Sequence, residues 1–294
     1  MEMEFKIQSK DSKLKIGIVT DEIATLPEEI IKENEIEIVH LILDWPEVEK
    51  IAGENIWQKL RNAQKFGIKT FPKTSQPPPK AYLEAFKRKL QKFEKVLCLT
   101  VSSKISGCYN SALSIKEMLP EKEKIFIFDT LNAAAGQGLL VLRAIEMIKK
   151  GKEIEEILES LKNIAPKTKT CFLLEDPKYL LSIGRITKFQ AGAINLAKKL
   201  GFYLIMEFKN GSIKLGGISL AKNMAQALFK YFKRKTKNKT NLKVAINQCD
   251  NEKGAEDLKK YLENSKIKID FVSEGPKIFV AGGPGILVLS WQEM

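Results

Sequence analysis

Histidine is nearly absent from this chain of 294 residues, whose single example is His40 in the apolar run I-V-H-L-I-L. Four cysteines are scattered with no C-x-x-C pair: Cys98, Cys108, Cys171 and Cys249. This scarcity argues against a histidine-based catalytic triad, a zinc site and a disulfide framework. Cys98 and Cys171 lie in apolar, strand-like runs and are predicted to be buried thiols. His40 is predicted to lie in the core or at a strand edge.

Long hydrophobic runs and nucleotide signatures are also absent. No apolar stretch approaches the roughly 18 residues that span a bilayer. The amino-terminal M-E-M-E-F-K-I-Q-S-K lacks the apolar segment of a signal peptide. Neither G-x-G-x-x-G nor G-x-x-x-x-G-K-[ST] occurs. With 44% hydrophobic and 29% charged residues, the chain is predicted to be a soluble, globular, cytoplasmic protein.

The charge is strongly positive, with 49 Lys and Arg against 36 Asp and Glu and a formal net charge of +13. The densest basic stretch runs from Lys230 to Lys243. Such a run can contact nucleic acid, an anionic membrane surface or an acidic protein partner, but it is more often a solvated helix end and loop. Nucleic acid is therefore not the expected partner.

The first half of the chain alternates short apolar runs with helical patterns. The predicted strands include Lys15–Thr20, Glu37–Leu43, Val96–Val101 and Lys124–Phe128, and acidic or polar residues follow them. Strands that alternate with helices form parallel sheets covered on both faces. The sequence therefore predicts an α/β fold with a doubly wound parallel sheet in its amino-terminal part.

The second half has a different pattern. The predicted strands Tyr203–Phe208 and Ser212–Leu215 flank K-N-G, which is a hairpin signal, and Lys277–Ala281 is a further predicted strand. A hairpin implies antiparallel pairing, so we expect a mixed sheet in a carboxy-terminal α+β domain. The predicted domains are residues 1–165 and 166–294.

Three serines and a glycine follow the strand Val96–Val101 within a short loop: Ser102, Ser103, Ser106 and Gly107. Helical spacing begins after Gly107, so the stretch is a strand–loop–helix junction. Ligands of open parallel sheets bind at the carboxyl ends of strands, and a helix start favours an anion. Two interpretations stay open: Ser106 is only a helix N-cap, or the loop binds a carboxylate or phosphate.

The proline-rich stretch F-P-K-T-S-Q-P-P-P, residues 71–79, is predicted to be an extended, stiff loop. Thr74 and Ser75 lie at its centre, where a rigid backbone would hold their hydroxyls in place. A spacer between two helices is the alternative. Gly136 and Gly138, in A-A-A-G-Q-G, allow close backbone packing or leave room for the tail of a ligand.

An enzymatic alternative rests on acids at the ends of predicted strands, Asp21, Asp44 and Asp129. Such carboxylates could hold a metal for phosphoryl transfer on a small anionic substrate. Acids at these positions also cap helices routinely. Because the chain lacks a phosphate loop and an available histidine, catalysis is the second hypothesis.

Five motifs, taken in order, resemble those of the DegV family of bacterial lipid-binding proteins: I-V-T-D, T-S-Q-P, S-S-K-I-S-G-C-Y-N-S-A, L-L-S-I-G-R-I and the final G-G-P-G-I-L. They extend from Lys15 to the carboxyl terminus. The resemblance implies two α/β domains with a long-chain fatty acid bound between them, no catalysis, and no cofactor besides the lipid. Members that act in fatty acid activation present the bound acid to a separate fatty acid kinase, which is the partner that the resemblance implies.

The resemblance implies that Thr74 and Ser106 hold the fatty-acid carboxylate, and that Arg185 lies at the mouth of the site in the polar network and kinase-docking surface. Ser75 and Gly107, beside the two hydroxyls, are further candidate contacts of the carboxylate. The turn at Ala281 and Gly283 either brings backbone close to the ligand or merely turns the chain.

Three positions depart from the family pattern. Glu22 follows I-V-T-D where a serine is usual, and Cys108 replaces the threonine of S-G-T-Y. Ala281 stands where members of the activation pathway carry a histidine, two residues before G-P-G. That histidine belongs to the polar network around the carboxylate, so its replacement favours lipid binding over acyl-phosphate presentation.

Overall fold

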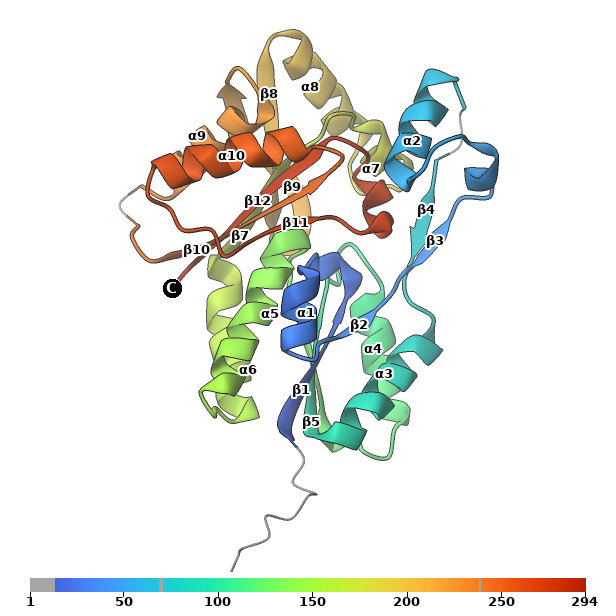
Figure 1. The fold of residues 1–294 in the computed structure, drawn as a ribbon, viewed down its shortest axis with the longest axis vertical. Helices are drawn as coiled ribbons and strands as arrows, with labels where there is room; N and C mark the ends of the chain where they lie inside the picture. The colour runs from blue at the N-terminus through green and yellow to red at the C-terminus, as the bar shows by residue number, and fades with distance from the viewer. Residues whose placement is uncertain (1–13, 69–70, 238) are drawn as a thin grey trace, which may run out of the picture.

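The computed structural model describes residues 14–68, 71–237 and 239–294, which form two main β-sheets (Figure 1). The first sheet has four parallel strands in the order β2-β1-β5-β6. Its strands are β1 (Leu14–Asp21), β2 (Glu37–Val39), β5 (Phe93–Thr100) and β6 (Ile125–Asp129). Its helices are α1 (Glu28–Glu33), α3 (Pro79–Lys92), α4 (Cys108–Met118), α5 (Ala134–Lys149) and α6 (Ile154–Ile164).

Strand β5 explains why this sheet carries helices on both faces. Leu97 and Leu99 pack with α5 and α6 on one face, whereas Val96 and Cys98 pack with α3 and α4 on the other. All four side chains are fully buried. A strand buried on both faces is a continuous apolar run, which is the pattern that predicted this element. The doubly wound parallel sheet is confirmed.

The second sheet is mixed and has the order β11-β10-β12-β7-β8-β9. Only β10 and β11 pair in parallel. Its strands are β7 (Thr168–Leu173), β8 (Phe202–Lys209), β9 (Ser212–Leu220), β10 (Leu242–Cys249), β11 (Phe271–Glu274) and β12 (Ile286–Glu293). Helices α9 (Met224–Lys235) and α10 (Glu252–Asn264) cover one face, and α7 (Lys178–Ser182) and α8 (Lys188–Lys199) lie on the other.

The predicted hairpin is the β8–β9 pair. Lys209 pairs with Ser212, and the two residues between them, Asn210 and Gly211, have φ values of 51° and 82°. Positive φ at both central residues is the signature of the turn that matches the twist of a two-residue hairpin. The mixed carboxy-terminal sheet predicted from this signal is therefore confirmed.

Helix α5 connects the two sheets, because it also packs against β7, β10 and β12 (Figure 1). Just before it, the Asn132 amide donates to the Thr168 carbonyl at 3.1 Å, and the Thr170 hydroxyl donates to Asn132 Oδ1 at 2.6 Å. Gly136 is essential to this contact, since a Cβ there would lie 2.0 Å from Thr170 Oγ1. The close backbone packing predicted for A-A-A-G-Q-G is thus present.

A third, two-stranded sheet pairs β3 (Ile42–Asp44) with β4 (Lys73–Ser75), and α2 (Ile56–Lys65) lies between them in sequence. Helix α2 packs on the second sheet, where Trp57 and Leu60 join a buried cluster with Phe172. Figure 1 shows this segment beside the second sheet, although in the chain it lies between β2 and β5 of the first sheet. A segment of the amino-terminal half therefore rests on the carboxy-terminal sheet.

Two predicted strands are wrong. Glu37–Leu43 splits into β2 and β3, which belong to different sheets, and between them the Glu22 carboxylate accepts the Leu41 N–H at 2.6 Å in place of a neighbouring strand. Residues Lys277–Ala281 form a 3₁₀ helix between Pro276 and Gly282 instead of a strand. Apolar runs of this length do not distinguish the two conformations.

Several compositional predictions can be compared with the fold. All four cysteines are buried and unpaired, as predicted for Cys98 and Cys171. His40 lies in the link between β2 and β3 with a side chain 74% exposed, so its predicted place in the core is wrong. Within the described ranges, no helix combines the length and the hydrophobicity that crossing a bilayer requires.

Candidate ligand-binding site

A cavity of about 400 Å³ lies between the two main sheets. On one side it meets loops that follow the carboxyl ends of the parallel strands, which is where open α/β sheets bind ligands. On the other side it meets β7, β8 and β12 with the segments beside them. Its apolar lining comes from both sides: Ile23, Leu41, Val101, Ile105, Ala133, Ala134, Phe172, Leu180, Ile183, Phe208, Ile213, Phe279, Ala281, Ile286 and Val288.

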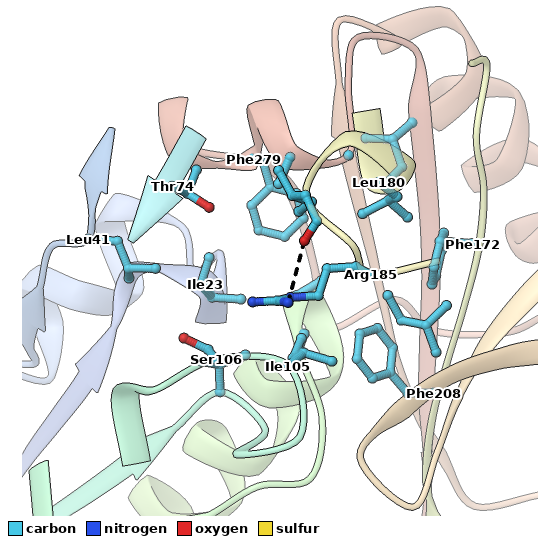
Figure 2. A pocket seen from close by; sticks show the side chains of 18 of the residues that line it. Ile23, Leu41, Thr74, Ile105, Ser106, Phe172, Leu180, Arg185, Phe208 and Phe279 are labelled. Carbon is cyan, nitrogen blue, oxygen red and sulfur yellow. Dashed lines mark hydrogen bonds between the residues drawn. The ribbon is translucent and has the colours of Figure 1, made fainter. Parts of the chain in front are cut away.

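The interior of the cavity is formed by large apolar side chains of the second sheet. The rings of Phe172 and Phe208 lie 6.0 Å apart, centroid to centroid, and Figure 2 shows Phe279 across the cavity near Thr74. Volumes of about 300–1,000 Å³ with mainly apolar walls are typical of small-molecule sites. The cavity is therefore suited to the apolar part of a ligand.

One end of the cavity is polar. Figure 2 shows the guanidinium of Arg185 reaching between the hydroxyls of Thr74 and Ser106. Arg185 donates only a long hydrogen bond of 3.5 Å, to the Ile183 carbonyl, and within the described ranges no carboxylate forms an ion pair with it. An unpaired cation beside two hydroxyls attracts an anionic group. Ser75, Gln76 and Gly107 complete this polar end.

The three serines of the loop, Ser102, Ser103 and Ser106, make different contacts. Ser102 is buried, and its hydroxyl donates to the Gly211 carbonyl at 2.8 Å, which ties the loop to the β8–β9 hairpin. Ser103 donates its backbone N–H to Asp129. Only Ser106 lines the cavity, and the N-cap of α4 is Gly107, so Ser106 is not the cap. Its Oγ accepts the N–H of Cys108 at 3.4 Å.

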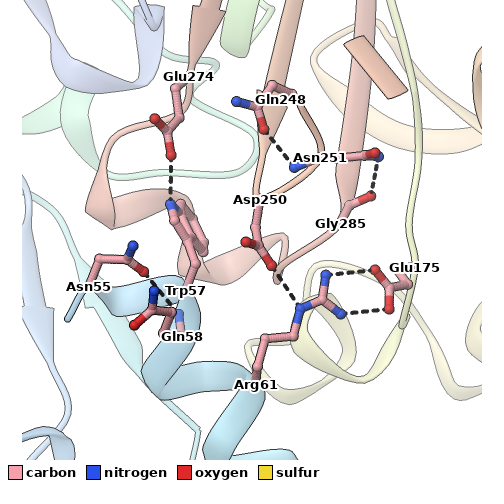
Figure 3. Close-up of polar contacts among 10 residues, drawn as sticks. All are labelled: Asn55, Trp57, Gln58, Arg61, Glu175, Gln248, Asp250, Asn251, Glu274 and Gly285. Carbon is pink, nitrogen blue, oxygen red and sulfur yellow. Dashed lines mark hydrogen bonds and ion pairs between the residues drawn. The ribbon is translucent and has the colours of Figure 1, made fainter. Parts of the chain in front are cut away.

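Thr74 reaches the cavity from a segment that is anchored to the second sheet. It lies in β4, and both β4 and α2 pack against the 3₁₀ helix Lys277–Ala281 that precedes β12. Helix α2 is also fixed to the second sheet by the polar contacts of Figure 3. Arg61 donates twice to Glu175, at 2.6 and 2.9 Å, and once to Asp250 at 2.7 Å. These bonds raise the pKa of Arg61. Thr74 and Ser106 therefore face each other from segments anchored to different sheets.

The glycine-rich turn before β12 brings only part of its length to the cavity. Ala281 and Gly282 line it, and Gly283 does not. Gly283 has φ +79°, and a Cβ there would lie 2.3 Å from the Tyr179 ring, so the turn allows close packing against α7. Gly136 and Gly138 do not line the cavity either; a Cβ on Gly138 would meet the Ala24 carbonyl at 2.7 Å.

Sequence reasoning missed most of the cavity wall. Phe208 and Phe279 carry no signal that separates cavity lining from core, because both are apolar residues in apolar runs. Gln76 is different: it belongs to the singled-out motif T-S-Q-P, and a Cβ on Gly107 would lie 1.4 Å from its Oε1. The polar motif could have suggested it as a lining residue.

The strand-end acids do not gather at the cavity. Asp21 and Asp129 accept backbone N–H groups, from Ile23 and Val101 and from Ser103 and Leu131. Asp44 is exposed on β3. None of the three lines the cavity, and the described residues contain no cluster of His, Cys, Asp and Glu able to hold a metal ion. Asp21 and Asp129 therefore hold the loops that follow their strands through backbone N–H groups.

The basic stretch Lys230–Lys243 makes several contacts within the chain. Arg234 and Lys235 lie 5.3 and 5.2 Å from the centre of the Tyr231 ring. Lys243 forms ion pairs with Glu146 and Asp270. These contacts accord with the interpretation of the stretch as a helix end and loop.

Asp21 makes stability depend on pH. Its burial raises its pKa from 3.8 to about 6, although the N–H of Val101 and the Gln137 amide both stabilise the charged form. At a pH between 3.8 and about 6, the Asp21 carboxyl is therefore protonated in the folded state and mostly ionised in the unfolded state. The free energy of unfolding should therefore fall by roughly 3 kcal/mol, from this group alone, as the pH rises from about 4 to about 6, and stay level above.

Urea unfolding of the wild type and of Asp21→Asn over this pH range isolates the effect. Other carboxyl groups titrate in both proteins and cancel in the difference. The advantage of the wild type over the variant should shrink as the pH rises. Parallel profiles for the two proteins would show that Asp21 has an ordinary pKa.

The fold and the site together define a class: an α/β protein with one parallel and one mixed sheet on either side of a mainly apolar cavity with a cationic, hydroxyl-rich end. The chain belongs to the DegV family, because the family model DegV, described as "Uncharacterised protein, DegV family", matches residues 15–293. The resemblance predicted from the five motifs is confirmed.

Individual relatives agree with this assignment. A DegV domain-containing protein of Clostridium acetobutylicum is 33% identical over 236 residues, which cover 79% of this chain and 82% of the relative. A Thermotoga maritima protein named fatty acid-binding protein is 30% identical over 287 residues, covering 92% of this chain and 96% of the relative. The crystal structure of a stearic acid-binding protein from Eubacterium ventriosum superposes with a TM-score of 0.77 at 26% identity, over 95% of this chain and 98% of that one.

Proposed function

We propose that this protein is a non-catalytic carrier that binds a long-chain fatty acid in the cavity between its sheets. The observation that carries the proposal is the Arg185 guanidinium, which has no ion-pair partner among the described residues and lies beside Thr74 and Ser106 at one end of a mainly apolar cavity. An amphipathic anion matches both parts of such a site. Relatives named for fatty acid binding support the choice of ligand.

In this proposal the carboxylate lies at the polar end. Thr74 and Ser106 donate their hydroxyl hydrogens to it, and Arg185 supplies positive charge from the second sheet. Ser75 and Gly107 border the head group, and the amino-terminal end of α4 adds the positive end of its dipole. Ala281 contacts the ligand through its methyl group, whereas Gly283 packs against Tyr179 and is not proposed as a contact.

The acyl tail supplies most of the binding free energy. Burying about 15 methylene groups at ~0.8 kcal/mol each provides roughly 12 kcal/mol. Association and ordering of the chain offset part of this gain. The polar end then decides which head group is accepted and fixes the direction in which the lipid lies.

The division of the chain at residue 165 is part of the proposal, with the cavity between domains 1–165 and 166–294. It is supported by the strands of the two main sheets, which lie on either side of that residue. Presentation of the lipid to a fatty acid kinase stays a prediction from the resemblance. Ala281 places a methyl group at the cavity wall where an imidazole would be expected, so we limit the proposal to binding.

Native mass spectrometry of the purified protein tests this function. A mass increment equal to one long-chain fatty acid should accompany the folded protein and disappear on denaturation. After delipidation, titration with a series of saturated and unsaturated acids should restore it and define the preferred chain length. A delipidated protein that binds none of these acids would contradict the proposal.

A further inference from the structure

The hydroxyl of Ser106 has two neighbours from a single residue. The backbone N–H of Cys108 donates to Ser106 Oγ at 3.4 Å, and the Cys108 sulfur lies 3.1 Å from the same oxygen. A serine hydroxyl offers one hydrogen and two acceptor positions. When the thiol donates as well, both acceptor positions are filled, and the hydroxyl hydrogen is left to point elsewhere.

The Cys108 thiol is able to donate throughout the neutral range. Its side chain is fully buried, and burial together with the nearby Asp21 carboxylate raises its pKa to about 12. The sulfur therefore keeps its hydrogen at neutral pH. Among the described residues, the hydrogen-bond partner recorded for the sulfur is the Ser106 hydroxyl, at 3.1 Å.

A second buried group lies behind the sulfur. Tyr82 is 0% exposed, and its hydroxyl lies beside Cys108 with no partner of standard geometry among the described residues. A phenol is a good donor and a thiol sulfur is a weak acceptor. From the core outward the groups are Tyr82, Cys108, Ser106 and then the cavity, and the Cys108 thiol can donate to the Ser106 hydroxyl.

We propose that Cys108 is a positioning residue that commits Ser106 to act as a hydrogen-bond donor toward the cavity. The inference rests on the proposed function. A carboxylate only accepts hydrogen bonds, whereas an alcohol of equal length both accepts and donates. A committed donor at Ser106 therefore selects the carboxylate head group, and Cys108 acts on head-group selectivity without touching the ligand.

Two substitutions of nearly equal shape separate this role from packing. Cys108→Thr keeps a side-chain donor, and Cys108→Val removes it. Dissociation constants are measured for hexadecanoic acid and hexadecanol, which share one tail. We expect the threonine variant to keep the wild-type preference for the acid. The valine variant should bind the acid about three- to tenfold more weakly, with an unchanged constant for the alcohol.

Cys98→Val is the matched control, because Cys98 is equally buried in the same cluster and does not contact Ser106. Cys98→Val should leave the dissociation constants for the acid and the alcohol at their wild-type values. Thermal unfolding checks that each variant is folded. If Cys108→Val does not fold, Cys108→Ala replaces it, with the same expected loss of acid preference. If the threonine variant and the donor-free variant show the same head-group preference, the role proposed for Cys108 is wrong, while the proposed function is unaffected. Failure of the wild type to bind the acid would overturn the proposed function and this inference with it.

Discussion

Replacing Ser106 by alanine and Thr74 by valine together should leave the cavity without its lipid while the chain stays folded. Each hydroxyl is proposed to donate to a charged carboxylate, and such a bond contributes about 1.5–3 kcal/mol. Losing both weakens binding by about 3 kcal/mol or more, which is roughly a hundredfold or more. Among the described residues, the protein contacts that the substitutions remove are those of Ser106 Oγ with Cys108, whose N–H it accepts at 3.4 Å and whose sulfur lies 3.1 Å away. Lipid content by mass spectrometry and the dissociation constant of the delipidated variant measure the effect.

Ser103→Ala is the control for this double variant. Ser103 lies on the same loop but does not line the cavity, so its replacement should change neither lipid content nor affinity. Thermal unfolding of the delipidated proteins should give the same midpoint for the wild type, the control and the double variant. Retention of lipid by the double variant would refute the roles assigned to the two hydroxyls.

The polar end of the cavity could be predicted from the sequence because its signals are local. The serine loop follows a recognisable buried strand, and prolines on both sides of Thr74 restrict the backbone that carries it. Local patterns could not predict how the serine loop and the Thr74 segment are anchored relative to each other. Thr74 faces Ser106 because α2 docks on the second sheet through Arg61, Glu175 and Asp250, residues far apart in the chain.

The apolar end could not be predicted for a different physical reason. A side chain such as Phe208 is apolar, lies in a strand and faces inward whether it meets other side chains or an empty cavity. Periodicity reports only that a face is removed from water. The same limit explains the error at Lys277–Ala281, whose apolar pattern fits a strand but whose flanking Pro276 and Gly282 leave it as a 3₁₀ helix.

Gly136→Ala should destabilise the protein strongly, although alanine is the better helix former. The new Cβ would lie 2.0 Å from Thr170 Oγ1 and 2.5 Å from Asn132 Oδ1, and both residues are buried. Thr170 Oγ1 donates a hydrogen bond to Asn132 Oδ1, and it also lies 2.9 Å from the Ser290 hydroxyl. Overpacking costs about 1–3 kcal/mol, and each buried polar group left without a partner costs a similar amount. We expect a loss of about 3–5 kcal/mol in the free energy of unfolding, measured by urea denaturation.

Gly192→Ala is the control, because the same substitution should stabilise the protein at this position. Gly192 lies in α8, and a Cβ there would meet nothing within 4 Å. The helix gains about 0.5–1 kcal/mol from the reduced freedom of the unfolded chain. Because Thr170 also lines the cavity, Gly136→Ala should weaken lipid binding as well, whereas Gly192→Ala should not. Equal stability of the two variants would show that α5 is not held against the second sheet at Gly136, and the cavity would then lack the fixed separation of its two walls that the binding site requires.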